Sequence, residues 1–141
     1  MTPLQALQQT LAGEHAAVYV YGVLGGRVSD SAEPRLAGRL ADAYTTHRSR
    51  RDQLTAMVGA AGRQPVAAAV SYRLPNAART PTELVTAARL TEERCAAVYA
   101  AGVGSTARDD RAWMLEALTD TAVRMLAFGA RPDPFPGAPE L

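Results

Sequence analysis

The sequence contains no lysine, so arginine supplies all 15 of its basic side chains. Aspartate and glutamate together number 14, and the formal net charge is +1. A chain with so little net charge exerts no global electrostatic attraction on nucleic acid or on an anionic lipid surface. We therefore expect neither nucleic acid nor a membrane among its partners.

Cysteine is almost absent as well. Cys95 is the only one, so no disulfide can form within the chain, which is typical of a reducing compartment. No apolar run approaches the roughly 20 residues needed to span a membrane, and the N-terminus lacks the basic and apolar regions of a signal peptide. We expect a cytoplasmic location.

The residues that are present suit one globular domain spanning 1–141, with 48% hydrophobic and 21% charged residues. Apolar residues recur at alternating steps of three and four, which predicts amphipathic helices and an all-α fold. We expect one helix from Leu4 to Gly25, preceded by a capping box at Thr2 and Gln5. The others are expected at 34–61, 81–102 and 108–128.

The first helix has a carboxylate inside its apolar stripe. Glu14 lies at the centre of that stripe, and a buried charge needs a partner, a proton or a metal. The second half of this helix is apolar nearly all the way round, which is typical of a helix at the centre of its own bundle or of one that forms a homodimer interface. The stripe consists of Leu4, Leu7, Leu11, Glu14, Val18, Tyr21 and Gly25.

Residues 62–80 contain Pro65 and Pro75 and lose the helical period, so we expect an extended crossover. Nineteen extended residues reach up to ~60 Å, enough to run along the whole bundle and place the third helix parallel to the second. A four-helix bundle with one long crossover has the connectivity of ferritin-like folds. The tail, 130–141, is rich in proline, and Phe135 is expected to dock it.

Each of the other helices also has polar residues near its middle. We expect Glu14, His47, Glu92 and Glu116 to meet at one height in the bundle, with Tyr44, Glu93 and Asp120 nearby. One stripe of the fourth helix contains Leu115, Leu118, Ala122 and Met125, and an adjacent one contains Trp113, Glu116, Asp120 and Val123. The run Arg48, Arg50 and Arg51 is interpreted as a solvated or salt-bridged face.

Several segments, in this order along nearly the whole chain, resemble an actinobacterial ferritin-like domain family of uncharacterised function. The resemblance implies a ferritin-like fold, and it implies no particular reaction. The segments are LAGEHAAVY (11–19), HRSRRD (47–52), YRLP (72–75), LTEERCAA (90–97), EALTDTAVR (116–124) and FPGAPEL (135–141).

Di-iron proteins of the ferritin-like superfamily use a Glu from each of two helices and a Glu-x-x-His from each of the other two. Glu14, His47, Glu92 and Glu116 match four of those six positions in residue type. Tyr44 stands where the second helix needs Glu, and Thr119 where the fourth needs His. The four matching residues are thus candidate metal ligands, for iron or manganese, of a degenerate site, or members of a hydrogen-bonded cluster.

The degenerate ligand set leads to three functional hypotheses. The first is a non-catalytic ferritin-like protein, a homodimer, that acts through assembly or an unknown partner and has no catalytic residue or organic cofactor. The second is a metal-dependent oxidase or iron-handling protein with a mononuclear or unusual dinuclear site. The third is a small-molecule binder, which would need an open pocket near Tyr44 and Trp113.

Overall fold

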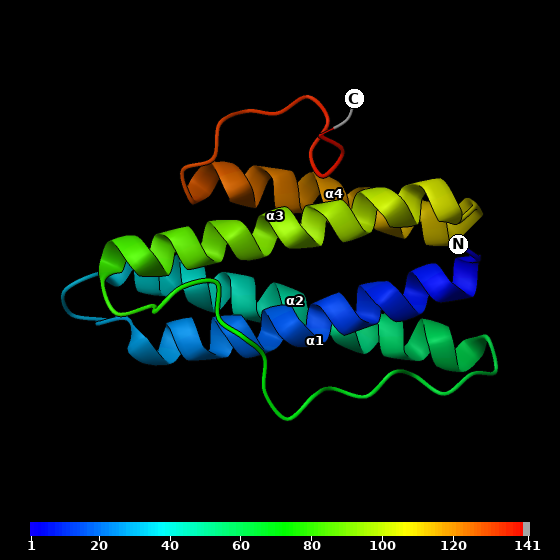
Figure 1. The fold of residues 1–141 in the computed structure, drawn as a ribbon, viewed down its shortest axis with the longest axis horizontal. Helices are drawn as coiled ribbons and strands as arrows, with labels where there is room; N and C mark the ends of the chain where they lie inside the picture. The colour runs from blue at the N-terminus through cyan, green and yellow to red at the C-terminus, as the bar shows by residue number, and fades with distance from the viewer. Residues whose placement is uncertain (140–141) are drawn as a thin grey trace.

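Residues 1–139 are described by a computed structural model, and four helices account for most of them (Figure 1). Glu140 and Leu141, the end of the tail motif, lie outside the described residues. No strand occurs within 1–139, so the prediction of an all-α four-helix bundle is confirmed. The helices are α1 (Pro3–Arg27), α2 (Pro34–Ala60), α3 (Pro81–Ser105) and α4 (Arg108–Ala127).

The start of α1 follows the local signals in the sequence. The Gln5 amide donates to Thr2 Oγ1 at 3.2 Å and the Thr2 amide donates to Gln5 Oε1 at 2.8 Å, which is the predicted capping box. The helix ends later than expected, at Arg27 and not at the Gly25-Gly26 pair. The Arg27 guanidinium donates to the carbonyl of Ala77 at 2.8 Å, so a contact with the crossover stabilises the extra turn.

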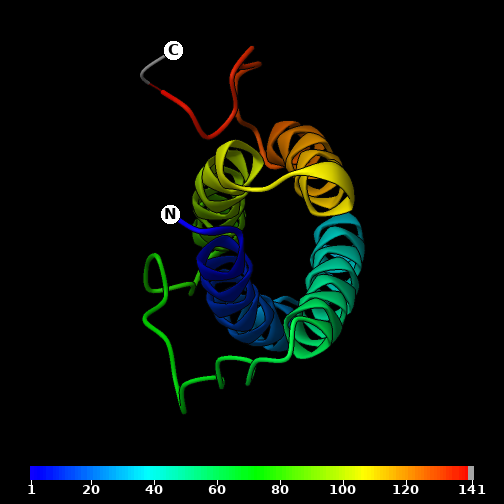
Figure 2. The same ribbon diagram turned by 90° about the vertical axis from the view of Figure 1, so that its right-hand side faces the viewer.

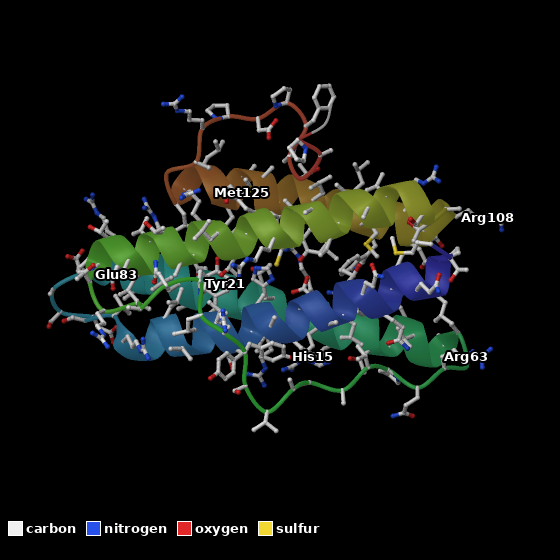
Figure 3. All side chains as sticks on the ribbon, viewed as in Figure 1. His15, Tyr21, Arg63, Glu83, Arg108 and Met125 are labelled. Carbon is white, nitrogen blue, oxygen red and sulfur yellow. The ribbon has the colours of Figure 1, made fainter. Side chains whose placement is uncertain are left out.

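The crossover between α2 and α3 returns along the length of the bundle, and α3 then runs parallel to α2 (Figure 1). It lies against α1, where His15 Nε2 is 3.0 Å from the carbonyl oxygen of Val66 and the rings of Tyr19 and Tyr72 are 5.6 Å apart. Figure 3 shows His15 on the crossover side of α1. At Tyr19 the crossover therefore covers part of the apolar half of α1, for which a homodimer interface was one of the two predicted explanations.

The interior consists of two apolar clusters with a polar layer between them. One cluster contains Tyr21, Leu24, Leu40 and Ala88 and lies where α1 ends and α3 begins. The other lies toward the opposite end of the bundle, and its members include Leu7, Leu11, Leu54, Val58, Tyr99 and Met114. Both are almost fully excluded from solvent, so any charge placed between them is remote from water.

The four sides of the bundle are not packed alike. Helix α1 packs along α2 and along α3, and α3 packs along α4. Helices α2 and α4 face each other on the remaining side (Figure 2), where long polar side chains cross a wider seam. The bonds across this α2–α4 seam include Arg39 to the Ala127 carbonyl (3.2 Å), Arg124 to Thr46 Oγ1 (3.3 Å), Arg50 to Thr121 Oγ1 (3.0 Å) and Trp113 to Gln53 Oε1 (2.6 Å).

The C-terminal tail contacts α3 through a glycine. Phe135 is 51% exposed, so the expectation that it docks the tail is wrong. A Cβ atom added to Gly137 would lie 2.3 Å from the carbonyl oxygen of Ala96, and the φ angle of Gly137 is +79°. Only glycine allows this approach of the tail backbone to α3.

Candidate functional site

The polar layer is built on a histidine held between two carboxylates. Glu14 comes from α1, His47 from α2 and Glu92 from α3, and all three side chains are at most 1% exposed. His47 Nδ1 lies 2.7 Å from Glu14 Oε2, and His47 Nε2 lies 3.0 Å from Glu92 Oε1. Both ring nitrogens thus face carboxylate oxygens, and both are N–H donors when the imidazole is protonated.

Two buried tyrosines extend the layer. The hydroxyl of Tyr21 donates to Glu92 Oε1 at 2.5 Å, and the hydroxyl of Tyr99 donates to Glu14 Oε1. The Tyr21 ring also stacks on the His47 ring, with centroids 5.3 Å apart, and Figure 3 shows Tyr21 within the bundle. Burial, reinforced by the charges nearby, raises the pKa of both phenols well above the usual range, so they remain protonated donors.

Two arginines, Arg50 and Arg124, complete the layer, and neither was predicted to belong to it. Arg50 lies one turn beyond His47 on α2 and is 7% exposed. Its guanidinium donates to Tyr99 Oη at 3.2 Å and to Asp120 Oδ2 at 2.6 Å. Arg124 also donates to Asp120 Oδ2, at 2.7 Å. Of the solvated or salt-bridged face predicted for the arginine run of α2, Arg50 is salt-bridged to Asp120, but it is buried and not solvated.

The protonation of His47 follows from these neighbours. Burial alone would lower its pKa, but hydrogen bonds and charge attraction from Glu14 and Glu92 outweigh burial and raise the pKa to about 9. Burial opposes ionisation of Glu92 too, yet its contacts with His47, and then Tyr21, hold the pKa of Glu92 below its usual value. At neutral pH the layer therefore holds an imidazolium between two carboxylates.

The charges of the layer balance. Three side chains are cationic, His47, Arg50 and Arg124, and three are carboxylates, Glu14, Glu92 and Asp120. The balance matters because an uncompensated charge at this depth costs several kcal/mol. The ion pair between Arg124 and Glu92 is a loose one, with Arg124 Nε 3.6 Å from Glu92 Oε1. Glu92 Oε2 and Arg124 Nε are both buried without a hydrogen-bond partner in the described structure.

Of the four residues predicted to meet, three do. Glu116 does not join Glu14, His47 and Glu92, because it lies exposed on α4. The inward face of α4 is formed instead by Met114, Ala117, Thr121 and Met125, and Leu115, from the apolar stripe of the sequence, is 53% exposed.

Of the three residues predicted to lie near the cluster, Tyr44, Glu93 and Asp120, only Asp120 contacts the charged layer. Glu92 points inward, whereas Glu93 pairs with Arg89 on the outer side of α3. Asp120 lies at the rim of the layer, 47% exposed, where both arginines reach it. Tyr44 is half-buried and packs against the apolar cluster that contains Tyr21, so it supplies no bond to the charged residues.

The donor set does not fit a di-iron centre. Within residues 1–139, no three or more His, Cys, Asp or Glu side chains are arranged to hold a metal ion. A metal-binding imidazole offers one nitrogen lone pair to the ion, whereas both nitrogens of His47 are directed at carboxylates. Arg50 and Arg124 bring positive charge to the same carboxylates. Metal binding by Glu14, His47, Glu92 and Glu116 stays a prediction.

Comparison with known proteins points to a family but to no activity. A family model described as "Domain of unknown function (DUF4439)" matches residues 6–140. The chain is also similar to the crystal structure of a conserved hypothetical protein, Rv2844, from Mycobacterium tuberculosis. The two share 31% sequence identity over 89% of this chain and 93% of that one, with a TM-score of 0.82. No curated protein matches.

Proposed function

Because the chain belongs to the family described as a domain of unknown function (DUF4439), its role must be sought in its own geometry, and we propose that it is a non-catalytic ferritin-like bundle that acts through assembly. In this proposal, the position of a di-iron centre is occupied by a protonated histidine and two arginines. The main support is His47, which bridges Glu14 and Glu92 through both ring nitrogens.

The chemistry of the layer supports a structural role for it. The raised pKa values of Tyr21 and Tyr99 keep these phenols protonated, and both ring nitrogens of His47 are engaged by carboxylates. The Cys95 thiol is buried, and burial raises its pKa well above the usual value, so it is a poor nucleophile. A buried reduced thiol also agrees with the cytoplasmic location that we propose.

The first test is metal retention. Purified, untagged protein is incubated with Fe(II), Mn(II) or Zn(II), passed through gel filtration and subjected to elemental analysis. We expect far less than one equivalent of each metal to be retained and no oxygen consumption with Fe(II), because arginine and imidazolium charges already compensate the carboxylates.

Retention of about one or two equivalents of metal, lost in a folded Glu14→Ala variant, would contradict this proposal. It would support the alternative function, a metal-binding oxidase or iron-handling protein. The matched control is Glu93→Ala, which removes the adjacent carboxylate on the outer side of α3. Circular dichroism of both variants separates loss of a ligand from loss of the fold.

The surface that we propose for assembly is the outer face of α4, with a second copy of the chain as its occupant. Leu115, Val123 and Leu126 are 53%, 63% and 46% exposed there. Together with Ala112 and Thr119 they follow the spacing 3-4-4-3, which is the same in both chain directions. An antiparallel copy would pair Leu115 with Val123 across a two-fold axis at Thr119, and a two-fold interface requires such self-complementarity.

This assembly is tested by light scattering coupled to gel filtration, over a range of protein concentrations. We expect a dimer, and we expect Leu115→Arg to make it monomeric, because the substitution places two charges in one apolar contact. The control is Val70→Arg, since Val70 is fully exposed on the crossover. A monomer at every concentration, or an equal response to both variants, would contradict the α4 interface.

A further inference from the structure

A cleft lies in the α2–α4 seam and borders the polar layer at Arg50 and Asp120. Its volume is about 410 Å³. Helix α2 contributes Thr46, Ser49 and Gln53, and α4 contributes Trp113, Glu116 and Asp120, each set at steps of three and four along its helix; Thr45, Arg50 and Ala117 complete the lining. The cleft is thus walled by hydroxyls, an amide, an indole and two carboxylates. Of the two residues near which the small-molecule hypothesis required a pocket, Trp113 lines this cleft and Tyr44 does not.

The two carboxylates of the cleft differ in their partners. Asp120 accepts from both Arg50 and Arg124 and is therefore neutralised. Glu116 forms no ion pair or side-chain hydrogen bond with any other described residue. It lies one helical turn from Trp113 on the same face of α4. The outer part of the cleft therefore presents an aromatic ring beside an unpaired negative charge.

The cleft already contains one cation, Arg50, but its guanidinium points toward the polar layer. The Arg50 guanidinium is held by Tyr99, Thr121 and Asp120 at the inner side of the cleft. Its charge is consequently committed to the buried layer, and Glu116 at the rim is left for another cation. Organic cations bind where a carboxylate supplies charge and an indole face supplies cation–π attraction. A guanidinium suits such a site best, because it both stacks on rings and pairs with carboxylates.

We propose that this cleft binds a small organic cation of the guanidinium class, stacked on Trp113 and paired with Glu116. The hydroxyl oxygens of Thr46 and Ser49 already accept from Arg124 and Gln53, and each retains one lone pair for a further donor. The site shares Arg50 and Asp120 with the polar layer, and Glu116 also borders the outer apolar face of α4. The proposal rests on Trp113, Glu116 and the lining of the cleft, and not on the proposed function.

The test uses Trp113 as its own reporter, since it is the only tryptophan. L-arginine and L-citrulline are titrated at constant ionic strength, and binding is followed by tryptophan fluorescence and by the indole N–H resonance in ¹H–¹⁵N spectra. The two probes differ only in that a neutral ureido group replaces the guanidinium. We expect a saturable response to arginine and at least about tenfold weaker binding of citrulline.

Two variants test whether Glu116 supplies the negative charge that binds arginine. Glu116→Gln keeps the side-chain shape and should weaken arginine binding about five- to tenfold. Asp109→Asn removes an exposed carboxylate of α4 outside the cleft and should leave binding unchanged. The proposal is overturned if arginine gives no saturable response, if citrulline binds equally well, or if Glu116→Gln binds arginine as tightly as the unaltered protein.

Discussion

Replacing His47 by alanine is expected to lower the free energy of unfolding by about 3–5 kcal/mol, the usual cost of removing one partner from a buried ion pair. The substitution leaves Glu14 and Glu92 facing each other at full burial with no imidazolium between them. Urea denaturation followed by circular dichroism measures the change.

A double-mutant comparison separates charge from volume. The same His47→Ala substitution in a chain that already has Glu14→Gln and Glu92→Gln should cost clearly less, because no carboxylate is then left unpaired. The cavity left by the imidazole is the same in both backgrounds. An equal cost in the two backgrounds would mean that His47 contributes by packing alone, and would contradict the charge-balanced layer.

Stability should also fall as the pH rises above neutrality. The pKa of His47 is about 9 in the folded protein against 6.5 ordinarily. Because the folded-state pKa is the higher one, this stabilisation is complete below about pH 6.5 and is lost as the pH rises through 9. The gap between the two values is worth roughly 3 kcal/mol in all, of which about 2 kcal/mol should be lost between pH 6 and pH 8.

Thermal unfolding at pH 6, 7 and 8 measures this loss, and we expect Tm to fall by roughly 6 °C over that range. His15 is the matched control, because it lies on the crossover side of α1 and outside the buried layer. The pH dependence should persist in His15→Gln. A Tm that is constant from pH 6 to pH 8, or an imidazole resonance of His47 that titrates near pH 6.5, would contradict the prediction.

At acidic pH, the carboxylates make stability change with pH in the opposite direction. Burial would raise the pKa values of Glu92 and Asp120, but bonds from His47 and from Arg124, respectively, lower them. Their stabilisation is therefore present above the ordinary carboxyl pKa and is lost as the pH falls through the lowered values. Above pH 8, the raised pKa values of the buried thiol and phenols add to the loss that His47 begins.

Local signals in the sequence were sufficient to locate the helices and three members of the buried layer. The capping residue Thr2 receives the expected backbone hydrogen bond from Gln5, and Thr80 receives the equivalent bond from Glu83 at the start of α3. Glu14 could be found because it interrupts an apolar stripe. These features depend on helical periodicity and on contacts between residues a few positions apart, and they hold whatever the helix packs against.

The rotation of a helix about its own axis depends on packing, and the predictions of which residues of α2 and α4 face the interior were partly wrong. From His47, a step of four leads to Arg51 and a step of three leads to Arg50, and both agree with 3.6 residues per turn. Helix α4 presents Ala117 and Thr121 to the interior, and these small side chains leave room for the Arg50 guanidinium, which bonds to both. Leu115, from the apolar stripe of α4, is exposed instead. No pattern within α4 indicates that its interior face must accommodate an arginine side chain from α2.

The polar bonds across the α2–α4 seam also affect how the bundle can open. Separating α1 from α3 would expose the leucines and tyrosines of both apolar clusters, and would carry the large heat-capacity increase of hydrophobic exposure. Separating α2 from α4 would break the hydrogen bonds of Arg39, Arg124 and Trp113, and also those of the buried Arg50 with Thr121, Ala117 and Asp120. An opening of this side would therefore break chiefly polar and ionic bonds, whereas an opening between α1 and α3, which pack closely along their length, would chiefly expose apolar surface.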